Sequence, residues 1–348
     1  MTPGGAGVRR PDHQPQTAPT HAPGITGVTA GAVLGPYLRT QAADFLRSLR
    51  LHRENTAPTD AGSRTAEQAA TALRRSSRRI SATLRTFRTA LDPLWAEQLH
   101  TELTWLSTTL AREHAYADRL VRLLDALHGL SGGTALPAAR TPGDKGRPVL
   151  GAARAGALLE RQLTLARTRA HSAALQALGS ARFHAVADTV ALLASEVPLA
   201  PTATGPAADV LGDPAHRAEQ RLRGAVAALP PDESAEPYNE AHDAPWHHTR
   251  LLLRLHRYAH EVVHGAPDPR LAAPVHALDL HRDAVEAAGA AAAAARTPRI
   301  APATAYALGV LHADQRHEVE AARAVFRESW PRAAADTVTG ATTGAVRS

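Results

Sequence analysis

The sequence contains no cysteine and few aromatic residues. Without cysteine the chain can form neither disulfide bonds nor thiolate metal sites, and it is compatible with a reducing compartment. Aromatic residues make up 4% of the chain and hydrophobic residues 44%, with alanine dominant among them. This composition favours helices packed closely through small side chains over a β-sandwich, which draws on β-branched and aromatic residues.

Long apolar runs are also lacking. No segment of about 20 strongly apolar residues occurs, so we expect no membrane-spanning helix. The longest apolar run, at 289–295, consists of one glycine and six alanines and is too weakly apolar to insert. The first residues lack the apolar segment of a signal peptide. We therefore expect a cytoplasmic protein that does not engage membranes.

Lysine is nearly absent, although the formal net charge is +6. Lys145 is the single lysine, so almost every cation is an arginine. A GC-rich genome, which favours arginine codons, would produce this bias. A requirement for guanidinium groups, which bind phosphate through two parallel hydrogen bonds, would produce it as well. Composition does not decide between these explanations, so the positions of the arginines must.

The hydrophobic periodicity and the positions of proline and glycine predict an all-α protein. No segment alternates with period two, and proline or glycine separates the helical segments. We expect helices at 36–52, 64–91, 94–114, 116–130, 151–178, 181–196, 208–229, 244–264, 270–297 and 302–329. Their lengths and short connections are typical of antiparallel bundles. The expected organisation is a disordered tail (1–32), a first helical half (33–130), a loop (131–150), a second helical half (151–333) and a disordered tail (334–348).

Two of these helices carry a stripe of arginines. At 100° per residue the stripe on the first is about 60° wide and contains Thr71, Arg74, Arg78 and Arg85, with Arg75 and Arg79 at its flanks. The stripe on the second is about 80° wide and contains His247, Arg250, Arg254, Arg257 and Glu261. The shared spacing [His/Thr]-x-x-Arg-x-x-x-Arg suggests an internal duplication.

The arginine stripes predict an anion-binding surface. A solvated helix face normally places acidic residues four positions from its cations, yet residues 71–88 contain no aspartate or glutamate. Arginines on one face repel each other unless an anion neutralises them. The alternative is an ordinary solvated face. If both halves bind one ligand, the two stripes should face each other across one groove.

Four segments in order resemble the CHAD domain, the conserved-histidine α-helical domain. RRISATLRTFRTALDP (78–93) resembles its first signature helix, and HHTRLLLRLHRYAHE (247–261) resembles its second. Residues 281–287 and 307–332 resemble later elements. The family is described as two four-helix bundles related by pseudo-twofold symmetry. The resemblance therefore implies an all-α fold of two pseudo-symmetric antiparallel helical bundles, without a sheet.

The resemblance also implies a function. The family binds inorganic polyphosphate through basic residues of the two signature helices and is not catalytic, which implies no cofactor, no metal and association with polyphosphate granules and their proteins. Carried over position by position, it implicates Arg74, Arg78, Arg79, Arg85, His247, Arg250, Arg254 and Arg257. Arg182, which precedes Phe183, stands where the family often has a basic residue.

Two further expectations concern the second signature helix. His247 can donate to a phosphate oxygen and would gain charge below about pH 6.5, so binding should tighten as the pH falls. Glu261 follows Arg257 by four residues, a spacing that predicts an ion pair between them.

The first signature departs from the family pattern. Thr71 stands where a histidine is expected, and Ser81 and Leu255 replace common basic residues. Residues 114–118 lack the Arg-Asp pair of the family. These departures leave open that only the second half binds, or that the chain is a helical scaffold that no longer binds. Nucleic acid is the other candidate ligand, but exposed aromatics among the cations, which base stacking requires, are not evident.

The segment HEVVH at 260–264 has the H-E-x-x-H spelling of zinc peptidases. His260 and His264 would lie on one helix face, as two zinc ligands require. The helix meets GAPDP directly after His264, so no third ligand follows locally, although Glu286 is conceivable. Neighbouring arginines would also oppose a zinc ion. A zinc metallopeptidase is therefore the remote alternative, and no glycine-rich phosphate loop or Ser/His/Asp set points to another catalyst.

Overall fold

The protein is all-α, as predicted. The computed structural model describes residues 27–54, 60–132, 147–231 and 239–339, and within these ranges it contains no strand, only two isolated backbone bridges. No helix in the described ranges is both long and apolar enough to cross a membrane. Most of the two predicted tails and of the predicted loop lies outside the described residues.

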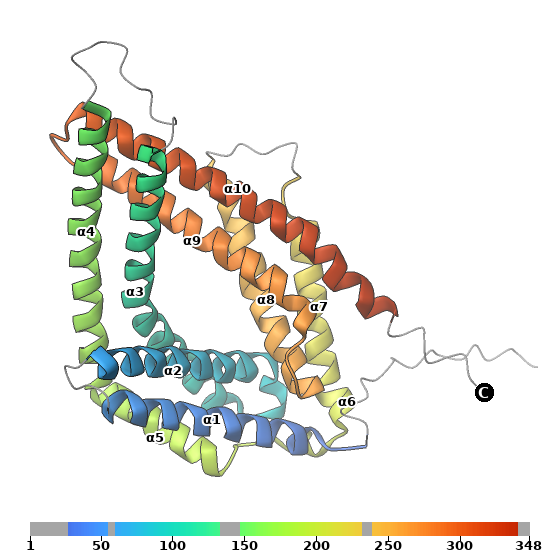
Figure 1. Cartoon of the computed structure of the whole chain (residues 1–348). Helices are drawn as coiled ribbons and strands as arrows, with labels where there is room; N and C mark the ends of the chain where they lie inside the picture. The colour runs from blue at the N-terminus through green and yellow to red at the C-terminus, as the bar shows by residue number, and fades with distance from the viewer. Residues whose placement is uncertain (1–26, 55–59, 133–146, 232–238, 340–348) are drawn as a thin grey trace, which may run out of the picture.

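The helices follow one another with short connections (Figure 1). In chain order they are α1 (Ala30–Glu54), α2 (Asp60–Thr86), α3 (Pro93–Gly132), α4 (Arg147–Leu178), α5 (Ala181–Ser195), α6 (Ala207–Val210), α7 (Gly212–Ala227), α8 (Asp243–His264), α9 (Ala272–Ala295) and α10 (Pro302–Thr339). Local chemistry sets several of the ends. The Asp92 carboxylate accepts a hydrogen bond from the Trp95 amide at the start of α3. Gly265, with a φ of 73°, ends α8 in the left-handed conformation.

Consecutive helices pack as hairpins, and the order of the hairpins repeats. α1 packs on α2 and α3 on α4, and after α5 and α6 the same order follows, with α7 on α8 and α9 on α10 (Figure 1). This repetition gives the two pseudo-symmetric helical bundles that were expected. The two helices with arginine stripes, α2 and α8, occupy equivalent places in the repeat and contact each other directly.

Three apolar clusters hold the helices together. The first joins α1, α2, the start of α3 and α5 to the end of α8, around Phe45, Phe87 and Phe183. The second is rich in alanine and joins α3 and α4 to α9 and α10. The third surrounds Trp246 and Phe326. Because the first and second clusters take helices from both predicted halves, the halves share their cores.

Close packing through small side chains is clearest where α4 meets α10. A Cβ at Gly151 would lie 2.5 Å from the carbonyl oxygen of Ala303, so only glycine fits there without pushing the helices apart. The scarcity of aromatic residues is therefore compensated by short distances between helices.

Some predicted helix boundaries were wrong. α3 runs unbroken from Pro93 to Gly132, where two helices were predicted, because the junction near Ala115 contains neither proline nor glycine. α10 continues beyond the predicted end at 329, with Pro331 inside it. The segment predicted as one helix at 208–229 divides at Leu211 into α6 and α7.

Candidate functional site

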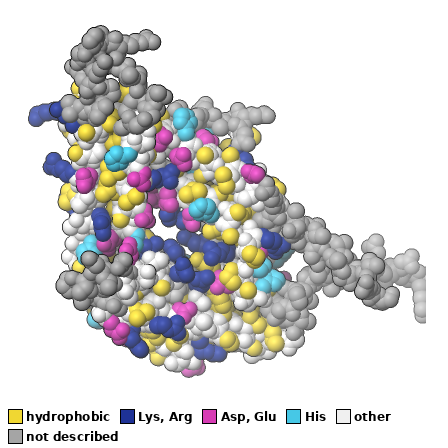
Figure 2. Space-filling model, in the orientation of Figure 1, with side chains coloured by type: hydrophobic (Ala, Val, Ile, Leu, Met, Phe, Trp, Pro, Cys, Tyr) yellow, Lys and Arg dark blue, Asp and Glu magenta, His cyan; other side chains and the backbone are white. Residues whose placement is uncertain are grey.

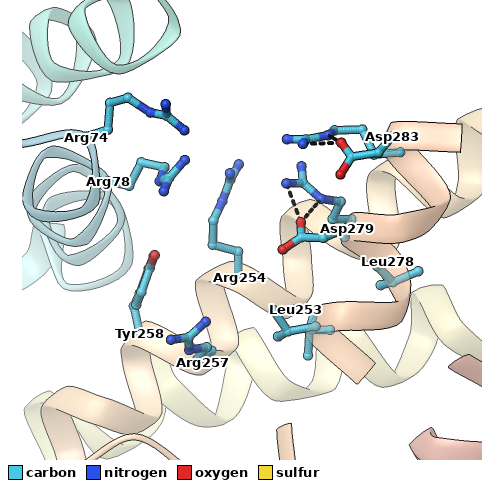
Figure 3. Close-up of a pocket in the computed structure, with 12 residues that line it drawn as sticks. Arg74, Arg78, Leu253, Arg254, Arg257, Tyr258, Leu278, Asp279 and Asp283 are labelled. Carbon is cyan, nitrogen blue, oxygen red and sulfur yellow. Dashed lines mark hydrogen bonds and ion pairs between the residues drawn. The ribbon is translucent and has the colours of Figure 1, made fainter. Parts of the chain in front are cut away.

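The arginine stripes of α2 and α8 face one open pocket, with a volume of about 250 Å³ (Figure 3). We call it the arginine pocket. Its arginines come from three helices and are Arg74, Arg78, Arg250, Arg254, Arg257 and Arg282. The rest of its lining is Leu253, Tyr258, Val275, Leu278, Asp279 and Asp283. Figure 2 shows basic side chains gathered in the hollow at the centre of this face.

Two of the six arginines are neutralised by neighbouring carboxylates. The Arg250 Nε donates to Asp279 Oδ1 at 2.7 Å, and the Arg282 Nε donates to Asp283 Oδ1 at 2.8 Å. The other four, Arg74, Arg78, Arg254 and Arg257, form no ion pair with any carboxylate of the described residues. The pocket therefore carries an excess of four positive charges, from six arginines and two carboxylates.

Burial makes these free charges costly. Burial, followed by repulsion from Arg250, lowers the pKa of Arg254 to about 10, although Tyr258 partly opposes the shift. The pKa of Arg74 is also lowered, first by burial and then by Arg78 and Arg282. The Nε atoms of Arg74 and Arg78 are buried without a hydrogen-bond partner. An anion in the pocket would supply both the acceptors and the charge that the free protein lacks.

Arg79 was predicted to bind the anion, but it lies outside this pocket. Its Nε donates to Glu261 Oε1 at 2.9 Å, and Glu261 is only 7% exposed. Burial alone would lower the pKa of Arg79, but the bond to Glu261 raises it. The predicted pair between Glu261 and Arg257 is wrong, because Glu261 points into the contact with α2 while Arg257 lines the pocket. Arg79 thus holds the two signature helices together.

Arg85 and Arg182 also lie elsewhere. Arg85 lines a second pocket, near Arg217 of α7. Arg182 of α5 pairs with Glu102 at 2.6 Å, and its guanidinium lies over the Trp105 ring, 4.1 Å from the ring centroid. The structure therefore does not bring these two predicted residues to the arginine pocket.

His247 lies near the arginine pocket but does not line it. Its ring is 5.5 Å from that of His281, centroid to centroid. Burial lowers the pKa of His247, and the opposing effect of Asp243 does not restore it. Any tightening of binding caused by its protonation should therefore occur at a lower pH than the sequence indicated.

Comparison with known proteins identifies the family. Residues 41–296 match the family model of the CHAD domain. The chain belongs to the CHAD-domain family. PptA from Streptomyces chartreusis is 58% identical, with a TM-score of 0.74 over 88% of this chain and 100% of that one. The CHAD domain from the plant Ricinus communis is 22% identical and shares the fold, with a TM-score of 0.56 over 90% of this chain and 97% of that one. No curated protein matches the sequence.

Part of the lining of the arginine pocket in this CHAD domain was not predicted from the sequence. Arg282, Asp279 and Asp283 all project from α9 into the arginine pocket. They flank His281, the first residue of a segment that resembles the family, and a helical projection of α9 would have placed the two carboxylates on one face. The spacing of the two carboxylates could therefore have been recognised, but α9 carries no stripe of arginines like those of α2 and α8.

The H-E-x-x-H segment does not form a zinc site. Glu261 is bonded to Arg79, and the rings of His260 and His264 stack with centroids 4.0 Å apart. Glu286, the conceivable third ligand, pairs with Arg119. Throughout the described part of the chain, no three histidines, aspartates or glutamates are arranged so that they could hold a metal ion. Among the described residues, the metallopeptidase alternative therefore lacks a set of three ligands.

Histidines within and just before this segment predict acid sensitivity. Burial lowers the pKa of His256, and burial followed by repulsion from His264 lowers that of His260 to about 4, although Asp268 partly opposes the shift. In the unfolded chain these histidines titrate near pH 6.5. Because the unfolded state then binds more protons, stability should fall as the pH falls from about 6.5 towards 4.

Urea unfolding of the CHAD domain at pH 7.5 and at pH 5 measures this loss. The variant His260→Gln should lose less stability between the two pH values than the wild type, whereas His184→Gln, at an exposed position on α5, should lose as much as the wild type. Equal losses in all three proteins would contradict the assignment.

Proposed function

We propose that this CHAD domain binds inorganic polyphosphate in the arginine pocket. The observation that carries the proposal is the convergence of Arg74, Arg78, Arg254 and Arg257, none paired with a carboxylate of the described residues, on one open pocket. A polyphosphate strand carries about one negative charge per unit and has no base to read. Guanidinium groups bind its phosphate oxygens through two parallel hydrogen bonds, and the pocket brings several guanidinium groups together.

Nucleic acid fits the pocket less well. Binding of single strands uses exposed aromatic rings on which bases stack, and the one aromatic lining residue, Tyr258, is 5% exposed. Neither signature helix is free to enter a groove of a duplex, because α2 and α8 are bonded to each other through Arg79 and Glu261. A bare strand of phosphates needs neither feature.

We propose binding without catalysis. The described lining contains no histidine, serine or threonine, and its two carboxylates are bonded to arginines. No lining group is therefore placed to activate water or accept a proton. A protein that holds part of a long polymer remains attached to it, so we propose that the protein associates with polyphosphate granules in the cytoplasm and meets other granule proteins there.

Binding of labelled long-chain polyphosphate over a series of salt concentrations tests the proposal. The wild type should bind tightly at low salt, and the logarithm of the affinity should fall linearly with the logarithm of the salt concentration. Duplex DNA should not displace the ligand. The double variant Arg250→Ala/Arg254→Ala should lose binding by about two orders of magnitude, since it removes the unpaired Arg254 and leaves the Asp279 carboxylate uncompensated in the pocket.

The control removes the same charge elsewhere. Arg167 and Arg169 are exposed on α4 and line none of the pockets described here. Arg167→Ala/Arg169→Ala should reduce the affinity only slightly. If the wild type fails to bind at low salt, the scaffold alternative replaces this proposal. If both double variants lose the same affinity, binding is a property of net charge and not of the arginine pocket.

A further inference from the structure

α5 carries a largely exposed stripe of residues beside its buried face. Figure 1 shows the helix along the lower edge of the molecule. The stripe, which we call the α5 stripe, consists of Arg182, Ala185, Thr189, Leu192 and, directly after the helix, Glu196. These positions are separated by three, four, three and four residues. Two helices of a coiled coil pack along positions with this spacing, so the stripe has the pattern of a contact between helices.

The α5 stripe is complementary to itself when it is reversed. Arg182 and Glu196 lie seven residues before and seven residues after Thr189. Two copies of α5 that pack antiparallel, with Thr189 at the crossing point, therefore place each guanidinium opposite a carboxylate. Ala185 and Leu192 lie four residues before and three residues after Thr189, so the larger side chain of one copy lies opposite the smaller side chain of the other. Charge and size both favour this pairing.

The side chains of the α5 stripe are available to a partner. Leu192 is 70% exposed and Leu94, at the start of α3, is 84% exposed, and these are the two most exposed large apolar side chains of the described residues. Glu196 is exposed and forms no ion pair within the described part of the chain. Arg182 is bonded to Glu102 through Nε and Nη2, but its side chain is 47% exposed, so Nη1 can donate to a second carboxylate. Exposed leucines beside such polar groups are typical of a protein interface.

The α5 stripe borders a pocket that can receive an apolar side chain. The pocket has a volume of about 190 Å³ and lies between α5 and the start of α3. Its lining consists of Trp95, Gln98, Leu99, Glu102, Arg182, Ala185, Val186 and Thr189. Ala185, the residue that would lie opposite Leu192 of a second copy, is part of this lining. The side chains of Trp95, Leu99 and Val186 would then surround that leucine and remove it from water.

We propose that a second copy of this chain docks on the α5 stripe and forms a dimer with Thr189 on its twofold axis. Leu192 of each copy enters the pocket between α3 and α5 of the other, and Arg182 of each copy pairs with Glu196 of the other. The contact uses the same surface on both copies, so it closes after two copies and forms no filament. A helix of 15 residues is about 22 Å long, so the contact is small and we expect a dissociation constant on the order of 10 µM. The dimer does not depend on what the arginine pocket binds.

Sedimentation velocity at protein concentrations from about 1 to 100 µM measures the dimer. Leu192→Glu should weaken it by about tenfold or more, because each dimer loses two buried leucines. Glu196→Arg should weaken it as well, because two guanidinium groups then face each other at both ends of the contact. Leu165→Glu is the matched control, since Leu165 is 49% exposed on α4, outside the α5 stripe, and its replacement should leave the dissociation constant unchanged. Thermal unfolding establishes that the variants fold, which their exposed positions predict.

The absence of cysteine from the chain allows the position of the axis to be tested directly. In Thr189→Cys the introduced thiol lies on the axis and meets its own counterpart, so mild oxidation should link two copies through a disulfide bond. His184→Cys, at an exposed position of α5 outside the stripe, should remain unlinked. A wild type that stays monomeric at about 100 µM would overturn the proposal. So would a dimer that Leu192→Glu does not weaken and that oxidation of Thr189→Cys does not link.

Discussion

Replacing Arg254 with methionine is expected to weaken polyphosphate binding by about 30-fold or more and to stabilise the free protein. Loss of one partner from a desolvated charge pair costs about 2–5 kcal/mol of binding free energy. Arg254 is the arginine for which burial and neighbouring cations together lower the pKa to about 10. Arg254 is therefore the arginine expected to contribute most to anion binding and to destabilise the ligand-free protein most.

The stabilisation follows from the direction of that pKa shift. The pKa of Arg254 is lower in the folded than in the unfolded protein. The charge of Arg254 therefore destabilises the folded state at every pH below about 10. This destabilisation decreases as the pH rises above that value. At neutral pH the cost is on the order of 3 kcal/mol. Methionine retains an apolar stem and removes the charge.

Urea unfolding without ligand and titration with long-chain polyphosphate measure both effects on one variant. Arg254→Met should raise the urea midpoint and lower the affinity. Arg167→Met, at an exposed site on α4, should change neither. A variant that loses stability would show that Arg254 holds the fold together, and the pocket would then not be strained in the absence of ligand.

Helical periodicity correctly predicted on which side of each helix the arginines of the site lie. It placed Arg74 and Arg78 on one face of α2, and Arg250 and Arg254 on one face of α8, and all four line the arginine pocket. It failed for Arg85, which shares the face of Arg78. A helical projection contains no position along the axis, and Arg85 lies two turns further, where α7 is the neighbour.

Contacts between distant segments could not be predicted from spacing. Arg79 differs from Arg78 by one residue, yet it meets Glu261, 182 residues further along the chain. Glu261 had a plausible local partner in Arg257, and only the packing of α8 against α2 decides between the two. The fold class, in contrast, depended on local features repeated along the whole chain, such as the excess of alanine and the absence of strand periodicity, and was predicted correctly.

The second large effect is expected at Asp243, in a charge network that the sequence did not reveal. This carboxylate, 4% exposed in the first turn of α8, accepts hydrogen bonds from Arg316 Nη1 at 2.7 Å and Arg323 Nη2 at 2.5 Å. Both arginines are on α10 and are at most 3% exposed. Asp243→Asn would leave two buried cations without this counter-charge, which should cost about 3–5 kcal/mol of unfolding free energy.

His281 cannot take over the role of Asp243. It is 1% exposed, and burial, followed by repulsion from Arg323, lowers its pKa to about 3, so it stays neutral. Glu320, bonded to Arg323 at 2.7 Å, compensates one of the two arginines only. Replacement of Asp243 removes a bond from both Arg316 and Arg323, whereas replacement of Glu320 removes a bond from Arg323. The cost of Asp243→Asn should accordingly be larger than that of Glu320→Gln, whose side chain lies at the edge of the network.

Urea unfolding of a set of variants separates charge from packing at this site. Because the penalty arises from uncompensated charge, the triple variant Asp243→Asn/Arg316→Met/Arg323→Met should be more stable than Asp243→Asn alone, although it carries more substitutions. Since Asp243 also fixes the start of α8, upstream of Arg250 and Arg254, Asp243→Asn should lose polyphosphate affinity, and the triple variant should regain part of it. Additive losses in the triple variant would contradict the electrostatic account and would indicate that the network stabilises α8 through packing.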